Sequence, residues 1–249
     1  GLAAPAANDA LPNWIASDIG DARAGGQKVH ASDVVEVYAE GTDIWAERDS
    51  FRFTHVRLSG DGEIVARLHR VVATNTYAKA GLMLRADAAA DAPCVMIHAF
   101  PGGNVMFSER ATRAATLSEK GAGNANGPVW MKLGRRGTTI TAAFSTNGTD
   151  WTNAGTSTLA MGEECLVGLA VTSHERGLFT TASWSDIAVT GTIVEPTQQP
   201  RAANERGVDA EALFARRTTS LPIANASFET GDGWTIKGGG LSLIQDSTA

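Results

Sequence analysis

The chain has 249 residues, of which 43% are hydrophobic and 19% are charged, and its formal net charge is −6. It is long enough for one large domain or two small ones, and its apolar content supports a sizeable core. No run of Lys or Arg offers a track for phosphates, which argues against nucleic-acid binding, and no apolar stretch approaches the roughly 20 residues of a membrane span. The 27 glycines, with frequent Thr, Ser and Asn, favour strands and turns over helices.

Residues 1–10 are mostly small and begin with Gly1 instead of Met, which indicates a leader remnant or a linker. Residues 11–190 are short apolar or alternating segments separated by turn residues every ~8 to 12 positions. Strands are expected over 11–20, 34–37, 41–45, 49–58, 63–72, 77–85, 94–100, 105–110, 129–134, 138–145, 151–156, 165–173 and 180–189. No helix of ordinary length is needed before residue 190, so this rhythm predicts an all-β, two-sheet antiparallel β-sandwich of jelly-roll type.

Two turns within this region carry hairpin signals. The sequence Ser59-Gly60-Asp61-Gly62 separates two strand-like runs and predicts a β-hairpin between them. Asn147-Gly148 is a stronger signal, because this dipeptide suits the tight turns that join antiparallel strands. Residues 111–127 have little apolar content and predict a weak strand followed by a loop.

The strand from Tyr77 to Arg85 has two chemically different faces. Period-two alternation places the small and apolar side chains on one face (Ala78, Ala80, Leu82, Leu84) and the remaining ones on the other (Lys79, Gly81, Met83, Arg85). The first face suits packing against a second layer. The second carries more charge than a packed face accepts without partners, so it is either a ligand-facing or a water-facing surface.

The strand around Trp130 repeats this division. Trp130 and Lys132 share one face, while Met131 and Leu133 take the opposite one. We therefore expect the cationic sides of the two strands to contribute to one shared sheet face.

After Gly191 the proline and glutamine content predicts a linker over 191–220, in which 208–217 has the charge order of a short helix. Residues 221–249 are too few for an independent core, so they are either the start of a truncated second β module or a tail packed on the sandwich. Cys94 and Cys165 each lie in an apolar, strand-like run, and both a disulfide and two buried thiols fit that pattern.

Several short motifs follow one another between residues 11 and 190. They are Leu11-Pro12 with Trp14, Asp43-Ile44-Trp45, Asp49 with Phe51 and Phe53, Gly60-Asp61-Gly62, Ala78 to Arg85, Trp130 with Lys132, Gly148 with Trp151, and Val167 to His174. In this order they resemble a jelly-roll family of the concanavalin A-like lectin/glucanase superfamily, related to the regulation-of-enolase-protein-like modules. Such modules are appended to bacterial secreted glycosidases and other large extracellular proteins.

The resemblance implies a secreted, non-catalytic module of a multidomain protein. Carbohydrate or polysaccharide and the neighbouring domains of a larger chain are then the expected partners. The stretch Asn225 to Trp234 resembles the opening strand of galactose-binding-like carbohydrate modules, which points in the same direction.

The motif spacing argues against two enzymatic functions. The hydrolases of this superfamily place their carboxylates as Glu-x-Asp-x-x-Glu, and that spacing is missing here because Asp43, Asp49 and Glu63 are isolated. Tyr77 to Gly81 and Ile97-His98 resemble pieces of the jelly-roll alginate lyases, but they occur in the reverse order. Hydrolysis and elimination are therefore both disfavoured.

A carbohydrate site needs an aromatic ring to stack on a sugar and polar groups for its hydroxyls. The candidate ligand-binding residues are Lys79, Arg85, Lys132, Trp45, Trp130, His174 and Asp43. They suit an anionic or hydroxyl-rich ligand. His98 shares a face with Cys94 and Met96 and is expected to be a core histidine.

The rival interpretation is a structural or adhesion domain. Its cations would form ion pairs with Asp43, Asp49 or Asp186 instead of meeting a ligand. No cofactor is indicated by a motif, and calcium stays open because no ligand set with calcium spacing occurs.

Overall fold

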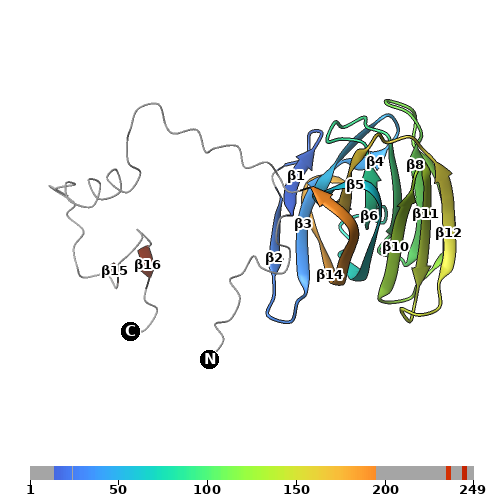
Figure 1. The fold of residues 1–249 in the computed structure, drawn as a ribbon. Coiled ribbons are helices and arrows are strands. Elements are labelled where there is room, and N and C mark those ends of the chain that lie inside the picture. The colour runs from blue at the N-terminus through green and yellow to red at the C-terminus, as the bar shows by residue number, and fades with distance from the viewer. Residues whose placement is uncertain (1–13, 24, 195–233, 237–242, 246–249) are drawn as a thin grey trace. The chain divides into compact units, whose positions relative to one another are not determined.

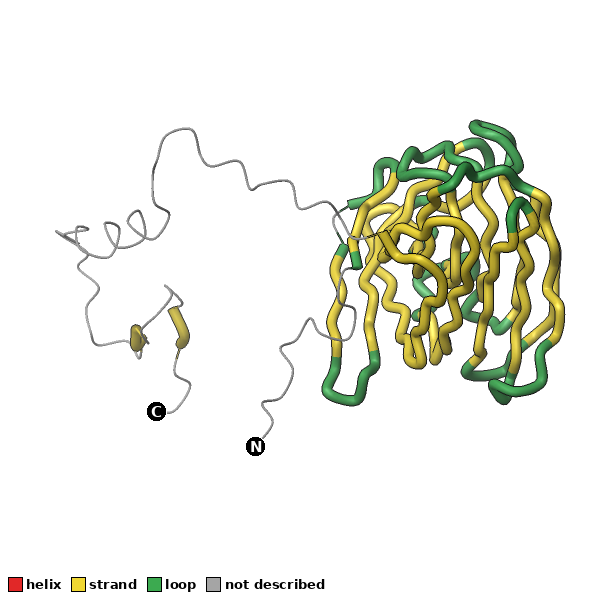
Figure 2. Tube along the Cα trace, in the orientation of Figure 1, coloured by secondary structure: helices red, strands yellow, loops and turns green. Residues whose placement is uncertain are grey.

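The computed structural model describes residues 14–23, 25–194, 234–236 and 243–245. In chain order its strands are β1 (Ile15–Ile19), β2 (Gly26–Val29), β3 (Val35–Gly41), β4 (Asp43–Trp45), β5 (Arg48–Val71), β6 (Lys79–Arg85), β7 (Cys94–Ala99), β8 (Asn104–Arg110), β9 (Ser118–Asn124), β10 (Val129–Arg136), β11 (Thr139–Ser145), β12 (Thr152–Thr158), β13 (Glu164–Thr172), β14 (Glu175–Val194), β15 (Trp234–Ile236) and β16 (Leu243–Gln245). Within these residues Figure 2 shows strands and loops but no helix.

The chain divides into two units, residues 1–196 and residues 197–249. In the second unit β15 and β16 pair as an antiparallel hairpin. The predictions for segment 1–10, for most of the linker, for the short helix and for the galactose-binding-like segment fall outside the described residues. No helix that could cross a membrane occurs in the described part.

The first unit is built around the 24-residue strand β5, which belongs to two sheets. Its first half pairs with β1 and β13, and its second half pairs with β10 and β14, whose last residues also reach the end of the first half. The strand pairing links 14 strands into one network, in which β5 is shared by two layers. The first layer, called the first sheet, has the order β1-β5-β13-β6-β7-β8-β9, and the second has the order β2-β3-β14-β5-β10-β11-β12. Figure 1 shows these strands stacked in two layers.

The expected hairpin around Gly60 is wrong, because the chain bends here and continues as one strand. Gly60 has a φ of 68°, which favours glycine. A Cβ on Gly62 would lie 2.4 Å from the carbonyl oxygen of Thr190, so the close approach of β14 requires glycine there. The glycines that suggested a tight turn instead allow β5 to pass from one sheet to the other.

The core between the sheets matches the alternation in the sequence. Leu82 and Leu84 of β6 meet Met131 and Leu133 of β10 in one buried cluster, which also contains Trp184. Each sheet therefore buries its apolar face against the other, as expected. The predicted all-β antiparallel sandwich is confirmed.

A second buried cluster lies on the outer face of the first sheet. It includes Phe51, Phe53, Met83 and Met96, together with Ile44 of the β4–β5 hairpin. This hairpin and nearby loops cover part of the face that the sequence suggested would be open.

Three other local predictions, a hairpin, a weak strand and a disulfide, can be compared with the structure. The Asn147-Gly148 hairpin joins β11 and β12, and β9 is the weak strand expected within 111–127. The disulfide alternative is wrong, because Cys94 and Cys165 are free and buried in different clusters.

Candidate functional site

Arg85 is not available to a ligand. Its side chain is fully buried, and its Nη1 donates to Asp49 Oδ2 at 3.0 Å. Arg110 binds the same carboxylate through two hydrogen bonds of 2.6 and 2.7 Å. The prediction that Arg85 contacts a ligand is therefore wrong, and for this residue the ion-pair alternative describes the structure.

Three other predicted residues come together, and a fourth, Trp45, lies beside them. The ammonium group of Lys79 forms an ion pair with Asp43, and Asp43 Oδ2 lies 3.1 Å from His174 Nδ1. The latter contact has an ion-pair distance but not the geometry of a hydrogen bond. The Lys79 side chain is only 3% exposed, compared with 20% for Asp43 and 29% for His174. A ligand would thus meet the carboxylate and the imidazole, with Lys79 beneath them.

Aromatic rings surround this ion pair. Trp45 is 43% exposed and Tyr77 is 57% exposed. The Nζ atom of Lys79 lies 5.7 Å from the centre of the Trp45 ring and 5.8 Å from that of Phe100. Tyr77 contacts both Phe100 and His174, with ring centres 5.8 and 5.4 Å apart. We call Asp43, Trp45, Tyr77, Lys79, Phe100 and His174 the Trp45–Tyr77 site.

Strand pairing brings these residues to one end of the first sheet. Thr172, the last residue of β13, pairs with Lys79, the first residue of β6, so the turn after β13 places His174 beside the lysine. Phe100 directly follows β7, whose Ala99 pairs with Ala80 of β6.

Backbone details fix two of these side chains further. His174 has a φ of 56°, an uncommon conformation for a non-glycine residue. The backbone N–H of Tyr77 donates to Asn75 Oδ1 at 2.9 Å, which orders the loop before β6.

A buried polar network lies below Phe100. His98 Nε2 is 2.9 Å from Glu119 Oε2 and 3.1 Å from Ser108 Oγ. Burial lowers the pKa of His98. Burial alone would raise the pKa of Glu119, but the hydrogen bonds with His98 and Ser108 and the charges of His98 and Lys79 together outweigh burial, so the pKa is lowered. His98 is fully buried on the face of Cys94 and Met96, so the core-histidine prediction is confirmed.

Trp130 and Lys132 lie elsewhere. They belong to β10 in the second sheet, whose Met131 and Leu133 face the core. Lys79 and Arg85 point outward from the first sheet, so the expectation of one shared face is wrong. The alternation was correct, but it could not tell which sheet each strand joins.

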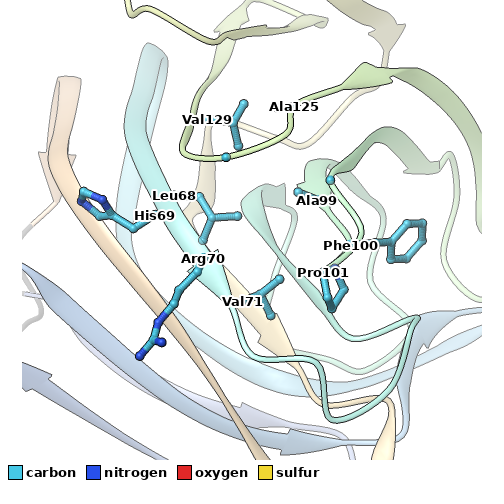
Figure 3. Close-up of a pocket in the computed structure, with 11 residues that line it drawn as sticks. Leu68, His69, Arg70, Val71, Ala99, Phe100, Pro101, Ala125 and Val129 are labelled. Atoms are coloured by element: carbon cyan, nitrogen blue, oxygen red, sulfur yellow. The ribbon is translucent and has the colours of Figure 1, made fainter.

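A small apolar pocket of about 190 Å³ also opens near the ends of β5 and β7. It is lined by Leu68, Val71, Pro101 and Val129, among others. In Figure 3 the Phe100 ring points away from it, as do His69 and Arg70. Ligand pockets usually combine apolar walls with convergent polar groups, so the Trp45–Tyr77 site is the better candidate.

Tyr77 and Phe100 were not among the residues selected from the sequence. Each stands at the junction of a strand and a turn, beside Asn75 or before Pro101-Gly102-Gly103. An aromatic residue in such a position was the signal available. Among the described residues, no group of three or more His, Cys, Asp or Glu side chains could hold a metal ion.

This chain folds as a two-layer antiparallel β-sandwich. It is similar to a functionally unknown protein from Saccharomyces cerevisiae, with 19% identity, a TM-score of 0.57, and coverage of 73% of this chain and 98% of that chain. At this identity the likeness shows the fold alone. No family model matches the sequence, and no curated protein matches it either.

Two looser structural matches are sugar-binding proteins by name. Carbohydrate-binding module CBM66 from Bacillus subtilis has 15% identity and a TM-score of 0.49, and the match covers 72% of this chain and 96% of that chain. Lectin II from Ulex europaeus has 11% identity and a TM-score of 0.43, with coverage of 72% and 93%. These TM-scores carry no argument about function.

Proposed function

We propose that this chain is a non-catalytic carbohydrate-binding module of a larger secreted bacterial protein, related to the regulation-of-enolase-protein-like modules. Its Trp45–Tyr77 site binds a neutral, hydroxyl-rich glycan. The observation that carries the proposal is the exposure of Trp45 and Tyr77 next to a partly exposed carboxylate and imidazole. Exposed aromatic side chains that gather at one place can mark a binding site, whereas single exposed ones need no explanation.

The chemistry of the site suits a sugar. An indole or phenol ring offers a flat apolar surface to the C–H face of a pyranose. Asp43 accepts hydrogen bonds from hydroxyl groups, and His174 supplies a further polar group at the same edge. Because Lys79 neutralises Asp43, the pair carries no net charge, which favours a neutral glycan over an anionic one.

The same contacts support a binding role over catalysis. Asp43 is held by Lys79, and Glu119 is held by His98 below the Phe100 ring. A glycosidase needs two carboxyl groups facing one glycosidic bond, one of them a proton donor. Neither carboxylate is free for such a role.

The test is binding of the full chain to a panel of neutral polysaccharides, by affinity electrophoresis followed by calorimetry. Trp45→Ala and Tyr77→Ala should each weaken binding about tenfold or more, because central aromatic residues dominate binding energies. Phe179→Ala is the matched control, since Phe179 is 46% exposed but lies outside the site. Equal binding by all three variants, or no retention of the wild type by any polymer, would contradict the proposal.

The second candidate is a structural or adhesion domain without a sugar ligand. It is favoured by the ion pairs of Lys79 with Asp43 and of Arg85 with Asp49, which show that both cations of β6 have internal partners. The Trp45 and Tyr77 variants separate the two functions, because a structural role predicts no change in glycan binding.

A further inference from the structure

The outer face of the second sheet carries two cations stacked on two indoles. The guanidinium carbon of Arg67 lies 4.2 Å from the centre of the Trp130 ring, and the Nζ atom of Lys132 lies 4.2 Å from that of Trp151. Trp130 is paired with Arg67 across β10 and β5, and Lys132 is the next outward residue of β10. The four side chains form one continuous strip, which we call the cation–indole strip.

These cations differ from Lys79 and Arg85 in having no acidic partner. Across the described ranges, neither Arg67 nor Lys132 takes part in an ion pair, whereas Arg57 on the same strand β5 pairs with Glu164. The Nε atom of Arg67 is buried without a hydrogen-bond partner.

Two acidic residues of neighbouring strands, Glu63 on β5 and Asp186 on β14, form no ion pair with the strip in the described part of the chain. The Glu63 side chain lies over Gly134, with Oε2 3.2 Å from where a glycine Cβ would stand. Asp186 Oδ2 accepts a hydrogen bond from Ser185 Oγ at 2.9 Å. Neither Arg67 nor Lys132 therefore has a carboxylate partner within the described residues.

We propose that the cation–indole strip is a second binding site, which takes carboxylate groups of an acidic polysaccharide. Arg67 and Lys132 occupy diagonal positions on adjacent strands, where side chains are about 7–8 Å apart at their bases. Two carboxylates on one polymer can thus be bound at once. The guanidinium offers paired N–H donors and the ammonium offers a compact charge.

The indoles explain why these cations are suitable for binding. A free Arg or Lys side chain loses rotamer entropy when a ligand fixes it. Stacking on Trp130 and Trp151 fixes the two side chains before the ligand arrives, so less of this cost falls on binding. Both indoles are partly exposed, so they can also contact sugar carbons.

A nucleic acid fits the strip less well. Duplex DNA carries one charge per about 1.7 Å, and its affinity grows with the number of phosphates neutralised. Two cations on a chain of net charge −6 give few such contacts. A carboxylated glycan needs fewer and combines them with contacts to its sugar rings.

The experiment compares polygalacturonate with the same polymer after methyl esterification, using the full chain at low salt. The wild type should bind polygalacturonate, lose affinity as the salt concentration increases and show no binding to the methyl ester. Arg67→Gln and Lys132→Gln should each weaken binding about tenfold, and the double variant about a hundredfold. Trp151→Leu keeps both charges and should cause a smaller loss.

Lys120→Gln is the matched control, because Lys120 also stacks on a ring, that of Phe107 at 5.0 Å, but lies in the first sheet on β9. Its binding should equal that of the wild type. Circular dichroism and the urea midpoint check that each charge variant is folded.

The proposal is overturned if the wild type does not bind polygalacturonate, if it binds the ester equally, or if the Arg67 and Lys132 variants behave like Lys120→Gln. Binding of single-stranded DNA with the same dependence on Arg67 and Lys132 would overturn the assignment to glycans. None of these results bears on the Trp45–Tyr77 site, which is tested with neutral polymers and other variants.

Discussion

Replacing Asp49 by Asn removes the only carboxylate that two buried guanidinium groups share among the described residues. Arg85, Arg110 and Asp49 all have fully buried side chains. Their positions tie together separate parts of the chain, because Arg110 also donates to the carbonyl oxygens of Trp45, Ala46, Ala92 and Ala115. The carboxylate thus stabilises the loops that cover the outer face of the first sheet.

The size of the effect follows from this burial. Asp49 accepts three hydrogen bonds of 2.6 to 3.0 Å from the two arginines. Removing one member of a buried ion pair costs about 3–5 kcal/mol, because the remaining charge has neither water nor a partner. For a domain of this size each kcal/mol shifts Tm by roughly 2–4 °C, so a fall of roughly 6–20 °C is expected.

The assay is urea unfolding followed by fluorescence, with thermal melting as a second measurement. Asp21→Asn is the control, since the Asp21–Arg176 pair is more than half exposed and should contribute little. Combining Asp49→Asn with Arg85→Met should recover part of the loss by removing one uncompensated charge. If Asp49→Asn moves the midpoint no further than Asp21→Asn does, the reasoning about this triad is refuted.

Three further predictions concern buried groups. Burial lowers the pKa of His55 to about 4 from 6.5. The folded state therefore favours the neutral imidazole. This preference stabilises the fold fully above pH 6.5, and up to about 3 kcal/mol of that stability is lost as the pH falls towards 4. Urea midpoints at pH 7 and pH 4.5 measure this loss of stability. His55→Gln should reduce the difference between the two midpoints. Equal midpoints for the wild type at the two pH values would contradict the prediction. Gly81→Ala places a Cβ 2.2 Å from a backbone carbonyl oxygen and should cost about 1–3 kcal/mol in a thermal melt. At Gly102 the added Cβ meets nothing within 4 Å, so equal effects of the two substitutions would argue against overpacking. Burial raises the pKa of Cys94 to about 11 and also raises the pKa of Cys165. Ellman's reagent at pH 8 should therefore react with neither thiol before the protein unfolds. A thiol of the native protein that reacts fast would show that the cysteines are not buried.

Much of the fold was predictable because strand patterns are local. The alternation in Tyr77 to Arg85 correctly separated the face packed against the second sheet from the outward face. Where a prediction from the sequence was wrong, contacts with strands distant in the chain determined the structure. Gly60 and Gly62 suit both a hairpin and a bend, and the approach of β14 more than a hundred residues later selects the bend. Strand β2 carries no alternation and was not predicted.

The candidate site was predictable in part. Asp43, Trp45, Lys79 and His174 were all selected, although up to 131 positions separate them, because ordered motifs gave each one a place in a jelly roll. Their mutual contacts could not be predicted. They depend on the pairing of β13 with β6, which no property of either strand alone specifies.

The cations of β6 and β10 show what alternation leaves undecided. Lys79, Arg85 and Lys132 follow the same pattern in the sequence, yet the first two are paired and the third is not. The difference arises from the β4–β5 hairpin, in which Asp43 and Asp49 occupy neighbouring positions, so one hairpin neutralises both cations of β6. Lys132 points outward from the other sheet, away from that hairpin, and stacks on Trp151 instead. A cation on an alternating strand therefore indicates a ligand only when the element lying across it supplies no carboxylate, and that element is known only from the fold.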